Sequence, residues 1–219
     1  MLAIPNRFPE YLVAAILIIL APGPSVLFAI ARAITWGRVS AIAAVAGNAL
    51  GMLTLSILVA FGLGPILQAS ELAFLAIQFL GGAYLLYLGI DAIRKSELHA
   101  AAIVSEGEFA GERADRPSQF RSIRDGFWVG ALNPKGLVFF AAILPQFLDR
   151  SASSSATGQL LTMGLTFAIL AFALDGTWAA IAGTVRDWLA TTPSRLVFLR
   201  RVGGVVMLLL GIFTFTSAL

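Results

Sequence analysis

Six apolar stretches alternate with short polar segments along this chain. Four of them contain no charged residue, one contains only Lys135 and one contains only Asp175. A helix needs about 20 apolar residues to cross the hydrocarbon core of a bilayer. The pattern therefore predicts an all-α integral membrane protein with six transmembrane helices. The stretches are residues 12–31, 39–70, 72–90, 126–148, 151–185 and 202–219.

Prolines interrupt the first and the fourth of these stretches, in the runs Ala21-Pro22-Gly23-Pro24 and Asn133-Pro134-Lys135. Proline removes a backbone donor and clashes with the carbonyl four residues earlier, so a helix breaks or kinks there. Unwound backbone at membrane depth persists only where protein or a water-filled cavity covers it. Paired breaks in two halves of a chain are typical of a transporter's substrate site, which we expect near the bilayer midplane.

The two halves of the chain resemble each other on either side of a polar segment at residues 96–122. The pattern of glycine, leucine and isoleucine from Gly81 to Ile90 recurs from Gly203 to Ile212 with the same spacing. Three crossings is an odd number, so a second copy must enter the membrane upside down. We therefore predict inverted three-helix repeats at residues 1–95 and 123–219, although glycine and leucine are common enough in lipid for a chance match. The segment 96–122 is interpreted as a flexible cytoplasmic connector, with a regulatory segment as the alternative.

Composition and charge set the class and the orientation. The chain is 58% hydrophobic and only 12% charged, whereas soluble domains carry about 25% charged residues, so no soluble domain is expected. Twelve of the 15 Lys and Arg residues flank the stretches on one side. The positive-inside rule then places both termini of a multi-pass protein outside the cytoplasm and the 96–122 loop inside it. Although Arg7 precedes the first stretch as in a signal peptide, the even count of crossings favours a retained span.

The residue inventory limits the chemistry. The chain has no cysteine, and its single histidine, His99, lies in the polar segment. Disulfides, thiolate catalysis and a histidine-built metal pathway are therefore excluded, and we expect no metal, no cofactor, no enzyme activity and no nucleic-acid partner. No phosphate-cradling GxxxxGK[ST] motif is present, so transport would not be driven by ATP through this chain.

Two opposite charges, Lys135 and Asp175, lie deep in the apolar stretches. A charge at the centre of a membrane helix costs ~2.5–3.5 kcal/mol, so neither side chain should face lipid. Lys135 is interpreted as a group that holds a substrate carboxylate, and its alternatives are a structural ion pair or a snorkelling side chain. Asp175 would bind a substrate amine or a coupling proton, or pair with Lys135.

The helix starts beyond the two breaks offer a second binding element. Amides in a first helical turn lack intrahelical partners and carry partial positive charge. A candidate cradle for an anionic group is therefore the backbone around Ser25, Val26, Lys135 and Gly136. A simple packing kink is the alternative. Buried amide side chains either orient a substrate or bond across helices. The complete predicted substrate-binding set is Pro22, Gly23, Pro24, Ser25, Asn48, Asn133, Pro134, Lys135, Gln146 and Asp175.

Several of these motifs together carry a family resemblance. They are Ala21-Pro22-Gly23-Pro24, Gly37-Arg38, Gly47 with Gly51, the run from Gly82 to Gly89, Leu132-Asn133-Pro134-Lys135 and Leu144-Pro145-Gln146-Phe147. The chain resembles the LysE/RhtB family of bacterial amino-acid exporters over nearly its whole length, except the 96–122 segment. The resemblance implies a location in the bacterial plasma (inner) membrane and export of amino acids or their derivatives, driven by a proton or ion gradient. Many relatives carry a histidine in the second span, where this chain has Met52-Leu53-Thr54-Leu55. Coupling here would therefore use Asp175, the substrate amine or neither.

The sequence thus predicts a secondary-active exporter, or antiporter, of an amino acid or amino-acid derivative, coupled to the proton gradient. Its partners would be that small molecule, protons or ions, and the lipid bilayer. The alternative is a non-transport membrane protein: an assembly factor, a passive channel or an enzyme. Two GxxxG motifs, Gly47 to Gly51 and Gly126 to Gly130, permit close helix contact and are explained equally by packing within one chain and by a homodimer.

Overall fold

The computed structural model describes residues 3–21, 23–69, 71–98, 100–101, 117–149, 151–152, 154–184 and 192–216. Within these ranges the secondary structure is helical and contains no strand, which confirms the all-α prediction. The elements are α1 (Phe8–Leu20), α2 (Pro24–Trp36), α3 (Arg38–Ala69), α4 (Glu71–Arg94), α6 (Gln119–Ala131), α7 (Pro134–Val138), the π-helical turn η1 (Phe139–Ile143), the 3-10 turn η2 (Leu144–Phe147), α8 (Ala156–Thr184) and α10 (Pro193–Thr216).

Four of the described helices are long and apolar enough to cross a membrane by themselves. The qualifying segments are Arg38–Gly62, Leu75–Arg94, Ala156–Ile181 and Ser194–Thr216. Two further pairs of helices are long and apolar enough when each pair is taken as one bent span. The bend is 49° between α1 and α2, and 44° between α6 and the segment Pro134–Phe147. Both bends fall at the predicted proline breaks, and the described residues therefore provide four to six spans of a multi-pass membrane protein.

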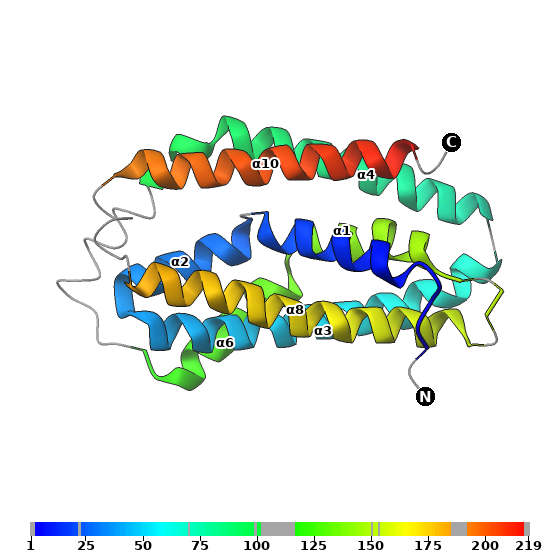
Figure 1. Cartoon of the computed structure of the whole chain (residues 1–219), viewed down its shortest axis with the longest axis horizontal. Coiled ribbons are helices and arrows are strands. Elements are labelled where there is room, and N and C mark those ends of the chain that lie inside the picture. The colour runs from blue at the N-terminus through cyan, green and yellow to red at the C-terminus, as the bar shows by residue number, and fades with distance from the viewer. Residues whose placement is uncertain are drawn as a thin grey trace.

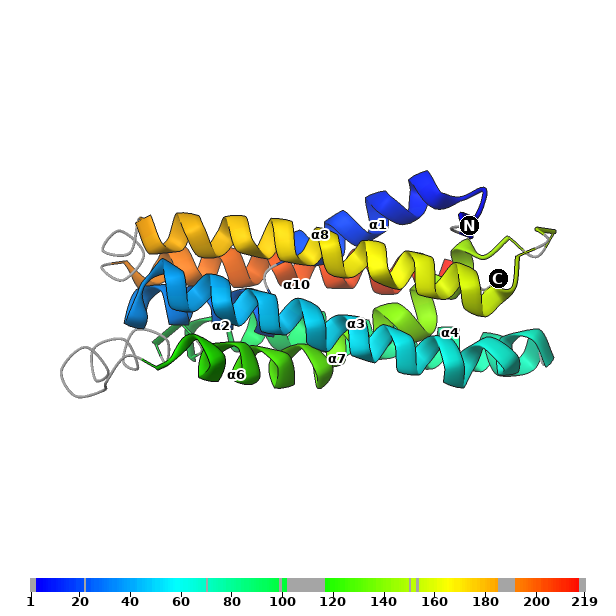
Figure 2. The ribbon, with the colours of Figure 1, turned by 90° about the horizontal axis from the view of Figure 1, so that it is seen from below.

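The helices form a bundle in which the broken helix α1–α2 lies between two groups (Figure 1). Helices α4 and α10 pack along each other on one side, and α3 packs against α6 and α8 on the other. The start of α1 and the end of α10 lie at the same end of the bundle (Figures 1 and 2). In Figure 2, α6 and α7 run along the edge of the bundle opposite to α1.

The glycines of both GxxxG motifs bring α3 and α6 into backbone contact. A Cβ at Gly47 would collide with the carbonyl oxygen of Ile123, and a Cβ at Gly126 would collide with that of Ala44. Gly51 and Gly130 meet the facing backbone in the same way. Packing within one chain therefore accounts for both motifs, and the homodimer remains a prediction.

Repeated glycines likewise join α4 to α10. A Cβ at Gly89 would lie 2.7 Å from the carbonyl oxygen of Gly204, and a Cβ at Gly82 would lie 3.3 Å from that of Gly211. In the predicted repeats Gly82 corresponds to Gly204, and Gly89 corresponds to Gly211. The two contacts between the antiparallel helices are therefore equivalent to each other. This close contact aligns the two helices that form one wall of the site described below.

The polar segment between the halves is only partly described. Helix α6 begins at Gln119, where the Ser118 hydroxyl accepts a hydrogen bond from the amide of Arg121. Helix α4 ends at Arg94, and after a turn at Lys95 residues Ser96 to Leu98 are again helical. His99 and residues 102–116 lie outside the described residues, so the predicted flexible connector and the domain boundaries stay predictions.

An aromatic core packs between α1, α8 and the turns η1 and η2. Tyr11, Phe139 and Phe147 are almost completely buried. The Phe140 and Phe167 rings meet edge to face, with centroids 4.9 Å apart. Since Tyr11 lies early in α1 and Phe147 ends η2, this core fills the end of the bundle where α1 begins.

Candidate substrate site at the two helix breaks

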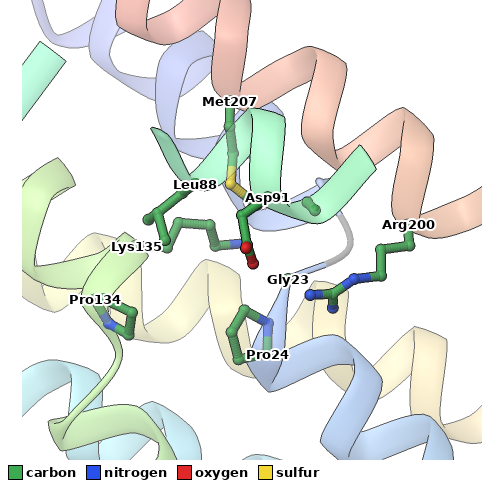
Figure 3. A pocket seen from close by; sticks show the side chains of 9 residues that line it. Gly23, Pro24, Leu88, Asp91, Pro134, Lys135, Arg200 and Met207 are labelled. Carbon is green, nitrogen blue, oxygen red and sulfur yellow. The ribbon is translucent and has the colours of Figure 1, made fainter. Parts of the chain in front are cut away.

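Both breaks border one cavity of about 230 Å³. Its walls come from α2, α4, α7 and α10 and include charged side chains of both signs (Figure 3). Its size suits a small solute, because sites for drug-sized ligands occupy about 300–1,000 Å³. The lining residues are Gly23, Pro24, Leu88, Asp91, Ala92, Pro134, Lys135, Arg200 and Met207.

At the first break, Lys135 completes the hydrogen bonding of the α1 backbone. Its ammonium group donates to the carbonyl oxygens of Ile18 and Ala21, each at 2.9 Å. The residue four positions after Ile18 is Pro22, which has no N–H to offer. A cation also suits the C-terminal end of a helix, where the backbone dipole is negative. Lys135 is therefore buried by a specific backbone contact and does not face lipid.

Gly23 allows Lys135 to approach this closely. A Cβ at position 23 would lie 3.0 Å from the Lys135 Nζ and 3.2 Å from its Cε. Such contacts are tighter than normal packing, so a larger residue would displace the ammonium group. The glycine between the two prolines thus has a definite structural role at the cavity.

At the second break, Asn133 caps the new helix. Its Oδ1 accepts hydrogen bonds from the amides of Lys135 at 2.9 Å and Gly136 at 3.3 Å, as expected of an N-cap residue. Its Nδ2 donates to the Ser25 hydroxyl at 2.6 Å. Asn133 therefore connects the second break to the first turn of α2, and the two breaks form one hydrogen-bonded unit.

Asp175 pairs with a different partner from the one considered in the sequence. Its Oδ2 accepts a long hydrogen bond of 3.5 Å from the Asn48 Nδ2, and both side chains are buried. Within the part of the chain that the structure describes, the Asp175 Oδ1 and the Asn48 Oδ1 have no hydrogen-bond partner. No ion pair between Lys135 and Asp175 is formed there. This buried polar pair does not line the cavity.

The remaining predicted residues are less central. The Gln146 side chain donates to the Ala142 carbonyl at 2.8 Å, and its backbone oxygen accepts from Arg7 at 3.1 Å, so it does not line the cavity. Pro22 lies outside the described residues. Four of the predicted residues line the cavity: Gly23, Pro24, Pro134 and Lys135. Ser25 and Asn133 are next to these residues in the chain and are hydrogen-bonded to each other. Their role in binding stays a prediction.

The sequence reasoning missed two charged residues of the cavity, Asp91 and Arg200. It ended the third stretch at residue 90 and began the sixth at residue 202, whereas the qualifying spans extend to Arg94 and start at Ser194. Arg200 is only 9% exposed. The repeated glycines were the available signal: if Gly89 faces Gly204 in antiparallel helices, Asp91 and Arg200 lie within about one turn of each other.

Comparison with known proteins agrees with this architecture. The family model "LysE type translocator" matches residues 16–218. A homoserine/homoserine lactone efflux protein of Salmonella typhimurium is 29% identical over 204 residues, which cover 92% of each chain. An uncharacterized membrane protein of Vibrio cholerae is 31% identical over 156 residues, 71% of each chain. No solved structure matches the chain.

A bundle of membrane-spanning helices with two breaks at a common cavity is the architecture of a solute transporter. With the family model covering nearly the whole sequence, the chain belongs to the LysE type translocators, which are transporters rather than enzymes.

Proposed function

We propose that this chain is a secondary-active exporter of an amino acid or an amino-acid derivative, homoserine-like in size and charge, coupled to the proton gradient. The observation that carries the proposal is the meeting of both helix breaks at one small, charged cavity. The likeness to the homoserine/homoserine lactone efflux protein supports the choice of substrate class.

In this proposal each bent pair of helices is one span, and the six spans form inverted repeats at residues 1–95 and 123–219. The start of α1 and the end of α10 lie at one end of the bundle, which is consistent with an even number of crossings. The facing glycines of α4 and α10 support a symmetric relation between the halves. By the positive-inside rule, both termini are extracytoplasmic and the 96–122 loop is cytoplasmic, in the plasma membrane of a bacterium.

With this orientation, the cavity lies toward the cytoplasmic ends of α4 and α10, because Asp91 and Arg200 are near those ends. The aromatic core around Tyr11 and Phe139 closes the extracytoplasmic half. Such an arrangement loads its solute from the cytoplasm, as an exporter requires. Transport would then require that the cavity be exposed alternately to the two sides of the membrane.

The first turn of α2 supplies the proposed anion contact. Its N-cap residue, Gly23, has no side chain and makes no side-chain cap hydrogen bond, so the partial positive charge at this helix start is available to an anion. The amides of Lys135 and Gly136, in contrast, already donate to Asn133. The proposed proton-coupling group is Asp175, whose Oδ1 has no hydrogen-bond partner within the described residues.

Dipeptide feeding of cells with and without this protein tests the proposal. Peptidases release amino acids inside the cell, and we expect one or a few of them to appear outside faster when the protein is present. A protonophore should abolish the difference. If no amino acid or lactone leaves faster with the protein, the exporter proposal is wrong. Downhill leakage that a protonophore does not affect would instead identify a passive channel.

A further inference from the structure

We infer that Arg200 and Asp91 bind the two ends of a zwitterionic substrate, with the carboxylate on the Arg200 guanidinium and the ammonium on the Asp91 carboxylate. This inference rests on the proposed export function and assigns that function's substrate contacts to residues outside the predicted set. It also transfers the carboxylate-binding role from Lys135 to Arg200.

Arg200 has the chemistry and the placement for a carboxylate. It lines the cavity from α10, and its side chain points toward the start of α2 near Pro24 (Figure 3). It is 91% buried, and its Nε has no hydrogen-bond partner within the described residues. A buried charge is retained at a cost that a partner must offset. The planar guanidinium can hold a carboxylate through two parallel hydrogen bonds, beside the uncapped positive end of α2.

Lys135 is less suited to this role because its ammonium group is already engaged. An ammonium group has three donors, and two of them bind the backbone carbonyls of Ile18 and Ala21. Releasing it for a substrate would leave those carbonyls without a donor in a buried site. We therefore assign Lys135 to the stability of the break and Arg200 to recognition.

Asp91 faces the same cavity from α4 and supplies the opposite charge. Its Oδ1 binds Lys95 at 2.6 Å, one turn later on the same helix, and the Lys95 side chain is half exposed. A carboxylate has about four acceptor positions, so a substrate ammonium can bind while this surface pair persists. The two charges of a free amino acid then match Arg200 and Asp91 in sign.

This assignment predicts how the site separates related solutes. Homoserine is a zwitterion at neutral pH, whereas its lactone keeps the ammonium group and lacks the carboxylate. Loss of the Arg200 charge should therefore reduce transport of homoserine and spare the lactone. Loss of the Asp91 charge should reduce transport of both.

The test is export of labelled homoserine and of its lactone, mixed in the same energised vesicles that contain the purified full chain. Because both solutes share each vesicle, their transport ratio does not depend on how much variant protein is folded. For Arg200→Gln we expect the homoserine-to-lactone ratio to fall at least tenfold, the lower end of what a lost hydrogen bond to a charged group costs. For Asp91→Asn we expect both rates to fall with the ratio unchanged.

Matched controls come from the same helical turns. Arg201 is half exposed and pairs with Glu97. Because exposed ion pairs contribute little free energy, Arg201→Gln should keep the homoserine-to-lactone ratio within about twofold of its value in the unmodified protein. Lys95→Met removes the ammonium group that binds Asp91 and should leave export of both solutes intact.

The outcomes separate the two proposals. If the unmodified protein exports neither solute nor any other amino acid, the export function fails and this inference fails with it. If it exports homoserine but Arg200→Gln leaves the ratio unchanged, only the assignment of Arg200 is wrong. If Arg200→Gln does not insert into the membrane, the test is a competition assay with the unmodified protein, in which unlabelled compounds inhibit export of labelled homoserine. Homoserine amide, which lacks the carboxylate, should inhibit at least tenfold more weakly than unlabelled homoserine. Equal inhibition would overturn the inference.

Discussion

Asn133 joins the two helix breaks, and its removal should destabilise the protein more than removal of the Ser118 cap at the start of α6. Asn133→Ala eliminates hydrogen bonds to two amides and to the Ser25 hydroxyl. A lost N-cap costs about 0.5–2 kcal/mol, and a lost neutral hydrogen bond costs about 0.5–1.5 kcal/mol. Because Asn133 and Ser25 are buried, the orphaned groups cannot all recover water, and we expect a total loss of about 3 kcal/mol.

The measurement is the thermal unfolding midpoint of the purified protein in detergent. For a chain of this size, 1 kcal/mol corresponds to about 2–4 °C, so Asn133→Ala should lower the midpoint by about 6–12 °C. The matched control is Ser118→Ala at the exposed start of α6, where one cap bond of 3.3 Å is lost. That change should lower the midpoint by less than about 4 °C.

A double-mutant cycle isolates the contact between the breaks. Ser25→Ala removes the Asn133–Ser25 bond and leaves the cap of the second break intact. The losses in Asn133→Ala and Ser25→Ala should therefore be non-additive by about 1 kcal/mol, because both include that one bond. Additive losses, or an Asn133→Ala midpoint within the range of Ser118→Ala, would refute the Asn133–Ser25 hydrogen bond as a stabilising connection between the two breaks.

Three further predictions follow from the same contacts. Lys135→Ala should abolish export while the protein still inserts, because the α1 carbonyls lose their donor; export at the normal rate would make Lys135 peripheral. Asp175→Asn should leave downhill export and remove its dependence on the proton gradient; retained sensitivity to a protonophore would exclude Asp175 as the coupling group. Gly126→Ala should lower the free energy of unfolding by about 1–3 kcal/mol, because the new Cβ meets the α3 backbone. Gly62→Ala should not, because nothing lies within 4 Å of a Cβ at that position. Equal thermal midpoints for these two variants would contradict the close backbone contact between α3 and α6.

The helix breaks could be predicted from sequence because their cause is local. Pro24 and Pro134 cannot donate within a helix wherever the rest of the chain lies, and both begin new helices in the structure. The membrane-spanning stretches could also be predicted from sequence, since a helix that crosses a bilayer requires a minimum number of consecutive apolar residues. The burial of Lys135 followed from its charge and its position beside a break.

The contacts of these residues required the tertiary structure. The sequence showed that Lys135 must avoid lipid, but its carbonyl partners lie on a helix more than a hundred positions earlier. Asp91 and Arg200 were missed because hydropathy alone assigns a charge at a span end to the flanking loop. Their position at the cavity depends on how α4 and α10 are rotated, which the close contact between Gly89 and Gly204 determines. A register derived from those glycines would have identified both residues.

The walls of the cavity differ in how they are held together, and this difference bears on how the cavity can open. Pro24 and Lys135 belong to the two broken helices, which Asn133 and Lys135 join through hydrogen bonds. Asp91 and Arg200 belong to α4 and α10, which are joined by glycine contacts. Separating the broken helices would leave several buried groups without partners, at about 1–3 kcal/mol each. We therefore expect the broken helices to move as one body and the solute to be exchanged by movement of the α4–α10 pair against them.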